Sequence, residues 1–364
     1  MKIFNIVGAR PNFIKVAPLH QEFSRRENFT SRIIHTGQHN DAEMSDIFFR
    51  QLSLPDPYIH LGTGGGNHAE QTARIMLAFD KMLDAERPDL VLVVGDVNST
   101  LACSLVAAKR HVPVAHVEAG LRSGDRAMPE EINRILTDQL SDFLFVSEES
   151  GLSHLAKEGI PADKIFLVGN VMIDALVQFQ PLAAQNPIVD QLNVDAGQYI
   201  LMTMHRPSNV DSEQNLRLFF ELLKEISISE RILFPIHPRT RQRFIEYGLA
   251  AELEALSNVL LLEPQGYIEF LSLMGKAKAV ITDSGGIQEE TTFLGIPCLT
   301  LRNSTERPAT IKYGTNQLLP LETDEVLKAL KKVGQPKQEK ASIPPLWDGK
   351  SASRVVDILE STLQ

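Results

Sequence analysis

The sequence predicts an α/β protein with two Rossmann-like, doubly wound domains that face a central cleft. Short β-branched runs alternate with helical patterns along the chain, which is typical of parallel strands joined by crossover helices. The alternation pauses between residues 169 and 187 and then resumes in a second half of similar size. A length of 364 residues is enough for two domains of ordinary size.

The expected elements follow this alternation in order. In the first half, strands are expected at 3–7, 32–36, 90–95, 114–117, 143–146 and 165–168. Helices are expected between them at 13–26, 69–85, 101–110 and 130–140. In the second half, strands are expected at 199–204, 232–236, 259–262, 279–282 and 297–301, with helices between them. We therefore predict an N-terminal domain at 1–170 and a C-terminal domain at 171–350. The last helix, 351–364, is expected to return to the first domain, the alternative being that it caps the second.

The composition narrows the possible functions. The formal net charge of −10 argues against nucleic acid as a partner, so an anionic substrate would need locally placed cations. The N-terminus lacks the pattern of a signal peptide, and no apolar run approaches the ~18 residues of a membrane span, so we expect a cytoplasmic protein. Cys103 and Cys298 stand far apart in apolar segments and are expected in the core, and no residue spacing indicates a metal site.

The segment 283–290 is the strongest local signal. It follows an apolar strand and opens the helix expected at 287–294, with Gly285 and Gly286 at the turn. Free N–H groups and the helix dipole favour an anion there, and one of Glu289 and Glu290, just inside the helix, is expected to accept hydrogen bonds from a neutral group such as a ribose. The alternative is that Asp283 or Ser284 is an ordinary N-cap.

Cations follow the strand ends of both halves. Arg10 and Lys15 lie where a helix should begin, a position that is unfavourable for cations unless an anion is nearby. The alternative is that both are surface cations paired to carboxylates. Arg307 is placed to reach an anion at the glycine pair, although Glu306 is an alternative partner for it. The complete set fits a diphosphate better than a monocarboxylate: Arg10, Lys15, His205, Arg206, His237, Arg239 and Arg307.

Three carboxylates are expected to converge on the cleft and to serve acid–base chemistry. Asp96 and Glu118 emerge at the ends of apolar strands, and Glu130 opens a helix. Each also has a structural alternative. Asp96 would cap the next helix, Glu118 would pair with Arg122 or Arg126, and Glu130 would suit the positive end of its helix. The glycine-rich loop 62–66 lacks the ending of a P-loop and is interpreted as a mobile connection.

These segments together resemble a known family, the non-hydrolysing UDP-N-acetylglucosamine 2-epimerases, over nearly the whole chain. The matching motifs are G-x-R-P…K at 8–15, T-G-Q-H at 36–39, G-D at 95–96, H-V-E-A-G-L-R at 116–122, P-E-E-x-N-R at 129–134, G-N…I-D at 169–174, H-R at 205–206, D-S-G-G-I-Q-E-E at 283–290 and T-E-R-P at 305–308. The resemblance implies the GT-B fold, no metal or redox cofactor, a homodimer and a role in polysaccharide biosynthesis. It also implies a reaction in which UDP is eliminated across C1–C2 of the sugar and then re-added, with the C2 proton returned to the other face.

The resemblance assigns roles by motif position. The catalytic residues would be Asp96, Glu118, Glu130 and His205. The UDP contacts would be Arg10, His237, Ser284, Gly285, Gly286, Glu290 and Arg307, to which we add the neighbouring cations Lys15 and Arg206. Bacterial family members can bind a second UDP-N-acetylglucosamine as an activator, and three residues occupy positions compatible with that site: Gln38, His39 and Arg74.

The chain departs from the family pattern at Asn12, Ser208 and Ala309, where a Glu is frequent, and at residues 97–98 and 171. These departures leave the UDP contacts in place and bear on the sugar and the activator. Other activities therefore stay open: 2-epimerisation of another UDP-2-acetamido sugar such as a diacetamido uronic acid, a hydrolysing epimerase, a GT-B glycosyltransferase, or a UDP-sugar sensor without catalysis.

Overall fold

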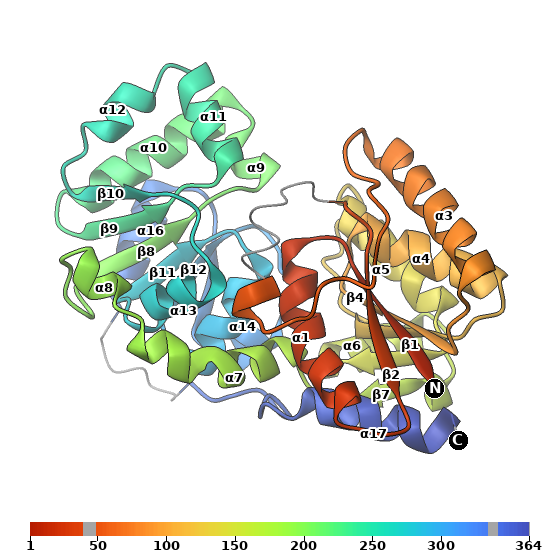
Figure 1. The fold of residues 1–364 in the computed structure, drawn as a ribbon. Coiled ribbons are helices and arrows are strands. Elements are labelled where there is room, and N and C mark those ends of the chain that lie inside the picture. Colours follow the sequence, from red (N-terminus) through yellow and green to blue (C-terminus); the bar gives the residue numbers. More distant parts are fainter. Residues whose placement is uncertain (39–48, 334–340, 364) are drawn as a thin grey trace. The chain divides into compact units, whose positions relative to one another are not determined.

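The computed structural model describes residues 1–38, 49–333 and 341–363 (Figure 1). The chain forms two compact units. Unit 1 contains Met1–Gln178 and Pro345–Gln364, and unit 2 contains Phe179–Pro344. The first boundary lies inside helix α7 (Val171–Gln185), whereas we placed it between residues 170 and 171.

Unit 1 is built on a parallel sheet of seven strands in the order β3-β2-β1-β4-β5-β6-β7. The strands are β1 Lys2–Val7, β2 Thr30–His35, β3 Ile59–His60, β4 Leu90–Val94, β5 Val114–Ala119, β6 Phe143–Val146 and β7 Ile165–Leu167. The helices are α1 Arg10–Ser24, α3 His68–Ala85, α4 Asn98–Lys109, α5 Pro129–Leu140, α6 Glu149–Lys157, α7, the 3₁₀ turn η1 Ala162–Lys164 and α17 Ser351–Leu363. Helix α1 packs against α17, and α4 packs between α3 and α5.

Unit 2 repeats the arrangement with a parallel sheet of six strands in the order β10-β9-β8-β11-β12-β13. The strands are β8 Tyr199–Thr203, β9 Arg231–Pro235, β10 Val259–Leu262, β11 Ala279–Thr282, β12 Cys298–Leu301 and β13 Asn316–Leu319. The helices are α8 Ile188–Gln191, α9 Pro207–Val210, α10 Glu213–Ser227, α11 Pro238–Glu246, α12 Ala250–Glu254, α13 Tyr267–Gly275, α14 Gly285–Leu294, α15 Ala309–Lys312 and α16 Thr323–Leu330.

Both strand orders are doubly wound, so each sheet has a switch point from which crossovers run in opposite directions. The switch lies between β1 and β4 in unit 1 and between β8 and β11 in unit 2. The central strand β4, with the sequence LVLVV, is buried along its whole length, as a parallel strand covered on both faces must be. Ligands of such sheets bind beyond the carboxyl ends of the strands at the switch point, and the residues singled out above cluster at these two places.

The predicted fold class is confirmed, and the expected strands and helices occur with shifts of a few residues at their ends. Two edge strands were missed, the two-residue β3 and β13. Helix α1 begins at Arg10, where the cations and Pro11 indicate a helix start, although the helical pattern itself was given as 13–26. Among the residues that the structure describes, no helix has the length and apolar character needed to cross a membrane.

The C-terminal helix packs in unit 1. Asp174 in α7 accepts the backbone N–H groups of Ser351 at 3.0 Å and Ala352 at 2.7 Å, which caps α17. The buried Trp347 donates its indole N–H to the carbonyl oxygen of Ser147 at 2.9 Å. Both ends of the chain therefore contribute to the same unit.

Candidate active site

The turn after β1 is joined to the end of β4 by one side chain. The amide oxygen of Asn12, in the first turn of α1, accepts the N–H groups of Gly8 at 3.1 Å and Ala9 at 2.9 Å. Its amide nitrogen donates to the carbonyl oxygen of Val94 at 3.1 Å. Asn12 is buried, so these bonds fix the two strand ends at the switch point of unit 1 relative to each other.

Lys15 reaches from α1 to the same place and forms a buried ion pair with Glu118 at the end of β5. A Cβ atom added to Gly95, directly after β4, would lie 3.2 Å from the Lys15 ammonium nitrogen, so a glycine at this position gives the lysine room. We predicted Lys15 as a diphosphate cation. The structure places it on Glu118, with both side chains shielded from water. Arg122, one of the two alternative partners that we named for Glu118, instead pairs with Asp138 and Glu158.

The backbone of Glu118 is left-handed, with φ at +75°. The pairing of β5 with β6 shifts register between Val117 and Ala119, which marks a β-bulge at Glu118. A non-glycine residue in this conformation costs about 1–3 kcal/mol, and such strain persists where surrounding contacts enforce it. The bulge re-aims the Glu118 side chain at the carboxyl end of the sheet, which is consistent with a functional carboxylate.

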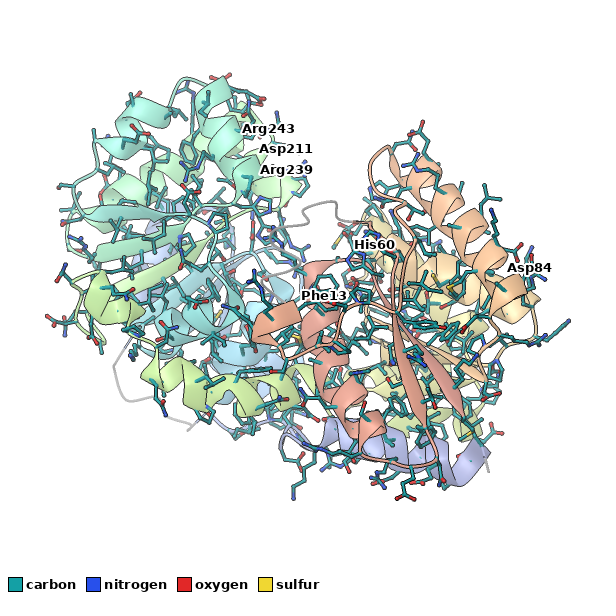
Figure 2. All side chains as sticks on the ribbon, in the orientation of Figure 1. Phe13, His60, Asp84, Asp211, Arg239 and Arg243 are labelled. Atoms are coloured by element: carbon teal, nitrogen blue, oxygen red, sulfur yellow. The ribbon has the colours of Figure 1, made fainter. Side chains whose placement is uncertain are left out.

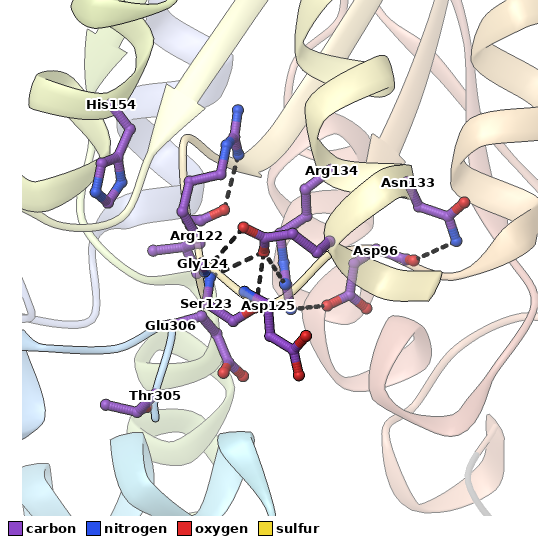
Figure 3. Close-up of polar contacts among 12 residues, drawn as sticks. Asp96, Arg122, Ser123, Gly124, Asp125, Asn133, Arg134, His154, Thr305 and Glu306 are labelled. Carbon is purple, nitrogen blue, oxygen red and sulfur yellow. Dashed lines mark hydrogen bonds and ion pairs between the residues drawn. The ribbon is translucent and has the colours of Figure 1, made fainter. Parts of the chain in front are cut away.

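Asp96, directly after β4, is held by an arginine network (Figure 3). Arg134 in α5 donates to the Asp96 carboxylate and also pairs with Glu131 at 3.2 Å. Glu131 in turn accepts the backbone N–H groups of Ser123 at 2.8 Å and Gly124 at 3.0 Å. The alternative that Asp96 caps α4 was wrong, because Val97 occupies the N-cap position of α4.

Glu130, the third predicted carboxylate, lies at the start of α5 and is partly exposed. Within residues 1–38, 49–333 and 341–363 its side chain forms no hydrogen bond or ion pair. Its neighbour Glu131 is buried and tied to the 123–124 loop, so the two adjacent glutamates differ sharply in environment. Glu130 is therefore the one that is accessible to a ligand.

A buried histidine–aspartate pair supports this edge of the sheet and was not predicted. His116 Nδ1 lies 2.6 Å from Asp138 Oδ1, and His116 Nε2 lies 2.8 Å from the carbonyl oxygen of Gly95. Burial alone would raise the pKa of Asp138, but the attraction of His116 and Arg122 holds that pKa below its usual value. The signal available in the sequence was His116 itself, a polar residue inside the strand predicted at 114–117.

In unit 2, Asp283 orients His205. The Asp283 carboxylate lies after β11, is fully buried and accepts the backbone N–H groups of His205 at 3.0 Å and Arg206 at 2.8 Å and the side-chain amide of Asn209 at 3.2 Å. His205 Nδ1 lies 3.0 Å from Asp283 Oδ1, while the histidine side chain keeps 39% of its surface exposed. Burial acts to raise the pKa of Asp283, but the hydrogen bonds from His205 and Arg206 hold it below the usual value.

This arrangement defines what the imidazole can do. With Nδ1–H donating to a carboxylate, Nε2 is the nitrogen that remains available to give or take a proton. The alternative that Asp283 is an ordinary N-cap of α14 was wrong, because its oxygens are used by the β8 loop. Sequence reasoning therefore found His205 but missed the residue that orients it.

The start of α14 carries the predicted glycine pair, with Ser284 at the N-cap position. The Ser284 N–H donates to Thr282 Oγ1 at 3.0 Å. A Cβ atom on Gly285 would lie 2.7 Å from Arg307 Nη1, so a larger residue here would displace the guanidinium. Arg307 therefore lies against the turn at which we expect an anion, and Gly286 follows as the second residue of the helix.

The Arg307 charge is shared with buried carboxylates. Its Nε lies 2.8 Å from Glu289 Oε1, and its Nη1 contacts Glu306. Arg302 also pairs with Glu306, at 2.7 Å, and Arg206 lies 3.9 Å from it. Glu306 thus does neutralise Arg307 in part, the alternative that we had raised. The guanidinium groups of Arg206, Arg302 and Arg307 thus lie close together near the start of α14, where they are balanced by the carboxylates of Asp283, Glu289 and Glu306.

Glu290 lies fully buried inside α14 and receives a hydrogen bond from the hydroxyl of Tyr267 at 2.9 Å. Burial raises the pKa of Glu290 to about 8, and the neighbouring Glu289 adds to the rise. Glu290 is therefore protonated at neutral pH in this structure. A ligand that donates hydrogen bonds to it, such as a ribose, would favour the ionised form instead.

His237, which we assigned to UDP, forms the N-cap of α11, where its Nδ1 accepts the N–H of Arg239 at 3.1 Å. The His237 and His205 rings lie 5.4 Å apart, so the two imidazoles are neighbours at the ends of β8 and β9. Arg239, in contrast, pairs with Asp211 beside Arg243 on the surface of unit 2 (Figure 2). Arg10 begins α1 and is half-buried.

The residues predicted for an activator lie around α3. The side-chain oxygen of Gln38 accepts the N–H of Ser99 at 2.9 Å and its hydroxyl at 2.7 Å, so Gln38 is bound to the first turn of α4. Arg74 in α3 is exposed and donates to the carbonyl groups of Gly64 and Gly65. His39 lies outside the described residues. Across the described part of the chain, no three His, Cys, Asp or Glu side chains are grouped as a metal site would require.

Two doubly wound parallel sheets, each with polar groups at its switch point, define an α/β enzyme of the GT-B class. A family model described as UDP-N-acetylglucosamine 2-epimerase matches residues 21–360. The chain belongs to this family, and the predicted enzyme class, an isomerase, is confirmed.

Individual relatives match over their whole length. The chain is 42% identical to the UDP-N-acetylglucosamine 2-epimerase of Methanocaldococcus jannaschii over 99% of both chains. The crystal structure of that enzyme in complex with UDP-GlcNAc and UDP superposes with a TM-score of 0.93 at 42% identity, covering 99% of this chain and 100% of the other. The chain is also 40% identical to the UDP-2,3-diacetamido-2,3-dideoxy-D-glucuronate 2-epimerase of Pseudomonas aeruginosa over 99% of both chains.

Proposed function

We propose that this protein is a non-hydrolysing UDP-N-acetylglucosamine 2-epimerase that interconverts UDP-GlcNAc and UDP-ManNAc by elimination and re-addition of UDP. The observation that carries the proposal is that Glu118 and Asp96 lie at the carboxyl edge of the sheet in unit 1. Glu118, in a strained backbone, lies beside Lys15 at the same edge as Asp96, where a doubly wound sheet binds its ligand.

In the elimination step, a carboxylate takes the proton from C2, a C1=C2 double bond forms, and the C1–O bond breaks with its electrons leaving on UDP. We assign proton transfer at C2 to Glu118, Asp96 and Glu130. A hydrogen beside an acetamido group is weakly acidic, so the base must be fixed in place before the substrate reacts. The buried contacts to Lys15 and Arg134 supply that fixation for Glu118 and Asp96. In the reverse step UDP re-adds at C1 and the proton is delivered to the opposite face of C2.

We assign the departing diphosphate to groups of unit 2. The N–H groups of Gly285 and Gly286 lie at the start of α14 next to the Ser284 side chain, and Arg307 lies against the glycine turn. His205, oriented by Asp283, is placed to donate a proton to a leaving oxygen through Nε2. The additional contacts that we propose for UDP are Arg10, Arg206, His237 and, for the ribose, Glu290.

A proton NMR time course in deuterium oxide tests the proposal. With UDP-GlcNAc alone, we expect signals of UDP-ManNAc to appear and the C2 proton to be replaced by deuterium in both sugars. Glu118→Gln should remove this exchange. Glu22→Gln, which breaks an ion-pair cluster on the opposite end of α1, is the matched control and should retain it. No exchange with the wild-type protein would refute the proposal, and free N-acetylmannosamine as product would indicate a hydrolysing enzyme. Exchange in the absence of any acceptor would exclude the glycosyltransferase and sensor alternatives.

A second candidate is 2-epimerisation of a UDP-2,3-diacetamido uronic acid. It is supported by the 40% identity to the Pseudomonas aeruginosa enzyme, which nearly equals the identity to the relatives named for UDP-GlcNAc. The same NMR assay with each nucleotide sugar separates the two candidates. Turnover of the diacetamido uronic acid without turnover of UDP-GlcNAc would select the second.

The assembly and its regulation belong to the same proposal. We propose a cytoplasmic homodimer, acting in polysaccharide biosynthesis, with a second UDP-GlcNAc as activator near Gln38 and Arg74. Two observations support one location for Gln38 and Arg74. The guanidinium of Arg74 is exposed, and Arg74 lies one turn from Gln71, whose side chain donates to the Gln38 carbonyl at 3.1 Å. Sedimentation tests the dimer. A lag with UDP-ManNAc as sole substrate that a trace of UDP-GlcNAc abolishes in wild type, but no longer abolishes in Arg74→Ala, would support the activator.

A further inference from the structure

Asp138 in α5 binds the chain on both sides of the strained residue Glu118. Asp138 Oδ1 lies 2.6 Å from Nδ1 of His116, two residues before Glu118. Asp138 Oδ2 accepts the backbone N–H of Gly120, two residues after Glu118, at 3.1 Å. Asp138 has no exposed surface, so one buried carboxylate spans the segment in which the β-bulge occurs.

His116 extends this contact to the neighbouring strand. Its Nε2 donates to the carbonyl oxygen of Gly95, the residue before Asp96, at 2.8 Å. The carboxylate of Asp138 is therefore linked through one imidazole ring to the turn that bears Asp96.

Two further contacts hold the segment after the bulge. The guanidinium of Arg122 donates to Asp138 Oδ2 at 2.7 Å and makes two bonds to Glu158, at 2.9 and 2.7 Å. His154 Nδ1 lies 2.8 Å from the carbonyl oxygen of Gly120. Gly120 is itself left-handed, with φ at +78°, and a Cβ there would lie 2.6 Å from the Gly151 carbonyl oxygen. The chain after the bulge is therefore closely packed against α6.

Asp138 makes more contacts than are needed to balance one buried positive charge. A carboxylate that only balanced Arg122 would not have to bind both His116 and Gly120. The residues that it does bind bracket the one non-glycine position of this strand with a left-handed backbone. Strain of this kind persists only where neighbouring contacts enforce it.

We propose that Asp138 is a positioning residue, which holds Glu118 in its left-handed backbone so that the Glu118 carboxylate stays beside Lys15 and ready for proton transfer. The link to catalysis rests on the proposed function. The structural claim does not depend on the proposed function. It is that Asp138 binds His116 and Gly120 on either side of Glu118, and we call these two bonds the Asp138 clamp. Asp138 does not touch the substrate in this scheme and acts through Glu118.

The test compares wild type with Asp138→Asn. Asn offers one acceptor and one donor in place of two acceptors, so it cannot satisfy His116, Gly120 and Arg122 together. Displacement of a reacting group by about 1 Å can cost on the order of 100-fold in rate, so we expect kcat for C2 deuterium exchange to fall about 100-fold. KM and the affinity for UDP should stay unchanged, because the UDP contacts assigned to unit 2 are not altered. Amide hydrogen exchange of the peptide 118–122 should become faster.

Two variants serve as matched controls. Asp142→Asn removes a carboxylate that accepts the N–H of Val114, at the opposite end of β5, at 3.0 Å. Glu158→Gln weakens the second partner of Arg122 but leaves both bonds of the Asp138 clamp in place. Both controls should retain the wild-type kcat and the wild-type amide exchange at 118–122. Should Asp138→Asn fail to fold, His116→Asn keeps a donor near Asp138 Oδ1 and loses only the bond to Gly95, and kcat should then fall about tenfold.

The outcomes separate the clamp from the proposed function. A folded Asp138→Asn protein with unchanged kcat and unchanged exchange at 118–122 would overturn the clamp. A parallel loss of kcat and UDP affinity, in proportion to unfolded protein, would equally overturn it in favour of a purely stabilising role. If the wild-type protein shows no C2 exchange, the proposed function fails, and the amide exchange of 118–122 in the variants still decides whether Asp138 holds the bulge.

Discussion

Replacing Asp283 by Asn tests how the His205 imidazole is oriented. The Asp283 carboxylate receives three N–H groups at Oδ2, from His205, Arg206 and Asn209, and His205 Nδ1 at Oδ1. The oxygen of an Asn side chain can keep the three bonds at the Oδ2 position. Its NH₂ group then faces His205 Nδ1, which must become an acceptor, so the ring proton moves to Nε2.

The substitution replaces one hydrogen-bond acceptor by a donor, and the expected losses of stability and of kcat follow from that change. One hydrogen bond to a charged group contributes about 1.5–3 kcal/mol, so the variant should lose roughly 2 kcal/mol of stability. That corresponds to a fall in Tm of about 4–8 °C for a unit of this size. Because the Asn amide carries no negative charge to stabilise the imidazolium that gives up a proton through Nε2, kcat should fall by about 10²–10⁴, the usual contribution of a general acid or base.

The assay is deuterium exchange at C2 together with UDP binding by calorimetry, at a temperature well below the Tm of the variant. Asp211→Asn is the matched control, because Asp211 is a carboxylate of the same unit that pairs with Arg239 and Arg243 on the surface. That control should change stability by less than about 1 kcal/mol and leave kcat unaltered. A residue with no role in catalysis should change kcat by less than about threefold. A folded Asp283→Asn protein whose kcat stays within that range would therefore refute the assigned role of the His205–Asp283 pair.

Three further predictions concern binding and stability. Gly285→Ala would place a Cβ 2.7 Å from Arg307 Nη1 and should weaken UDP binding by about 1–3 kcal/mol in calorimetry, whereas Gly275→Ala, where a Cβ meets nothing within 4 Å, should not. For Glu290, with a pKa raised from 4.5 to about 8, the folded state keeps a proton that the unfolded state has lost, so stability should fall as pH rises through that range. Urea unfolding at both ends of the range should show this fall in wild type and a flatter dependence in Glu290→Gln, and equal slopes would contradict the assignment. Asp174→Ala removes the cap of α17 and should cost about 1–2 kcal/mol, with faster proteolysis of the C-terminal helix; unchanged cleavage would argue that the cap is dispensable.

The alternation of strand and helix patterns was sufficient to predict both sheets, because buried parallel strands are apolar on both faces. The strands that escaped prediction lie at sheet edges. Ile59–His60 is too short to give a pattern, and Asn316–Leu319 begins with two polar residues. An edge strand is paired on one side only and can be short and polar, so its sequence carries little signal.

The location of the candidate site was also predictable, since polar motifs at strand ends mark the carboxyl edge of a parallel sheet. The pairing of side chains within the site could not be predicted from the sequence. The left-handed backbone of Glu118 arises from tertiary contacts, and a glutamate gives no local hint of it. Asp283 binds the N–H of His205, 78 residues away in the chain, so its short-range interpretation as a helix cap missed the true partner.

Unit 1 is completed by the last stretch of the chain, from Pro345 onward, through the buried Trp347 and the capped helix α17. During synthesis, the ribosome must therefore make all of unit 2 before the first unit receives its final layer. Until then, the surface of α1 that α17 covers stays open to water and to other chains. Premature termination near the end of the message would consequently damage the half of the molecule that was translated first.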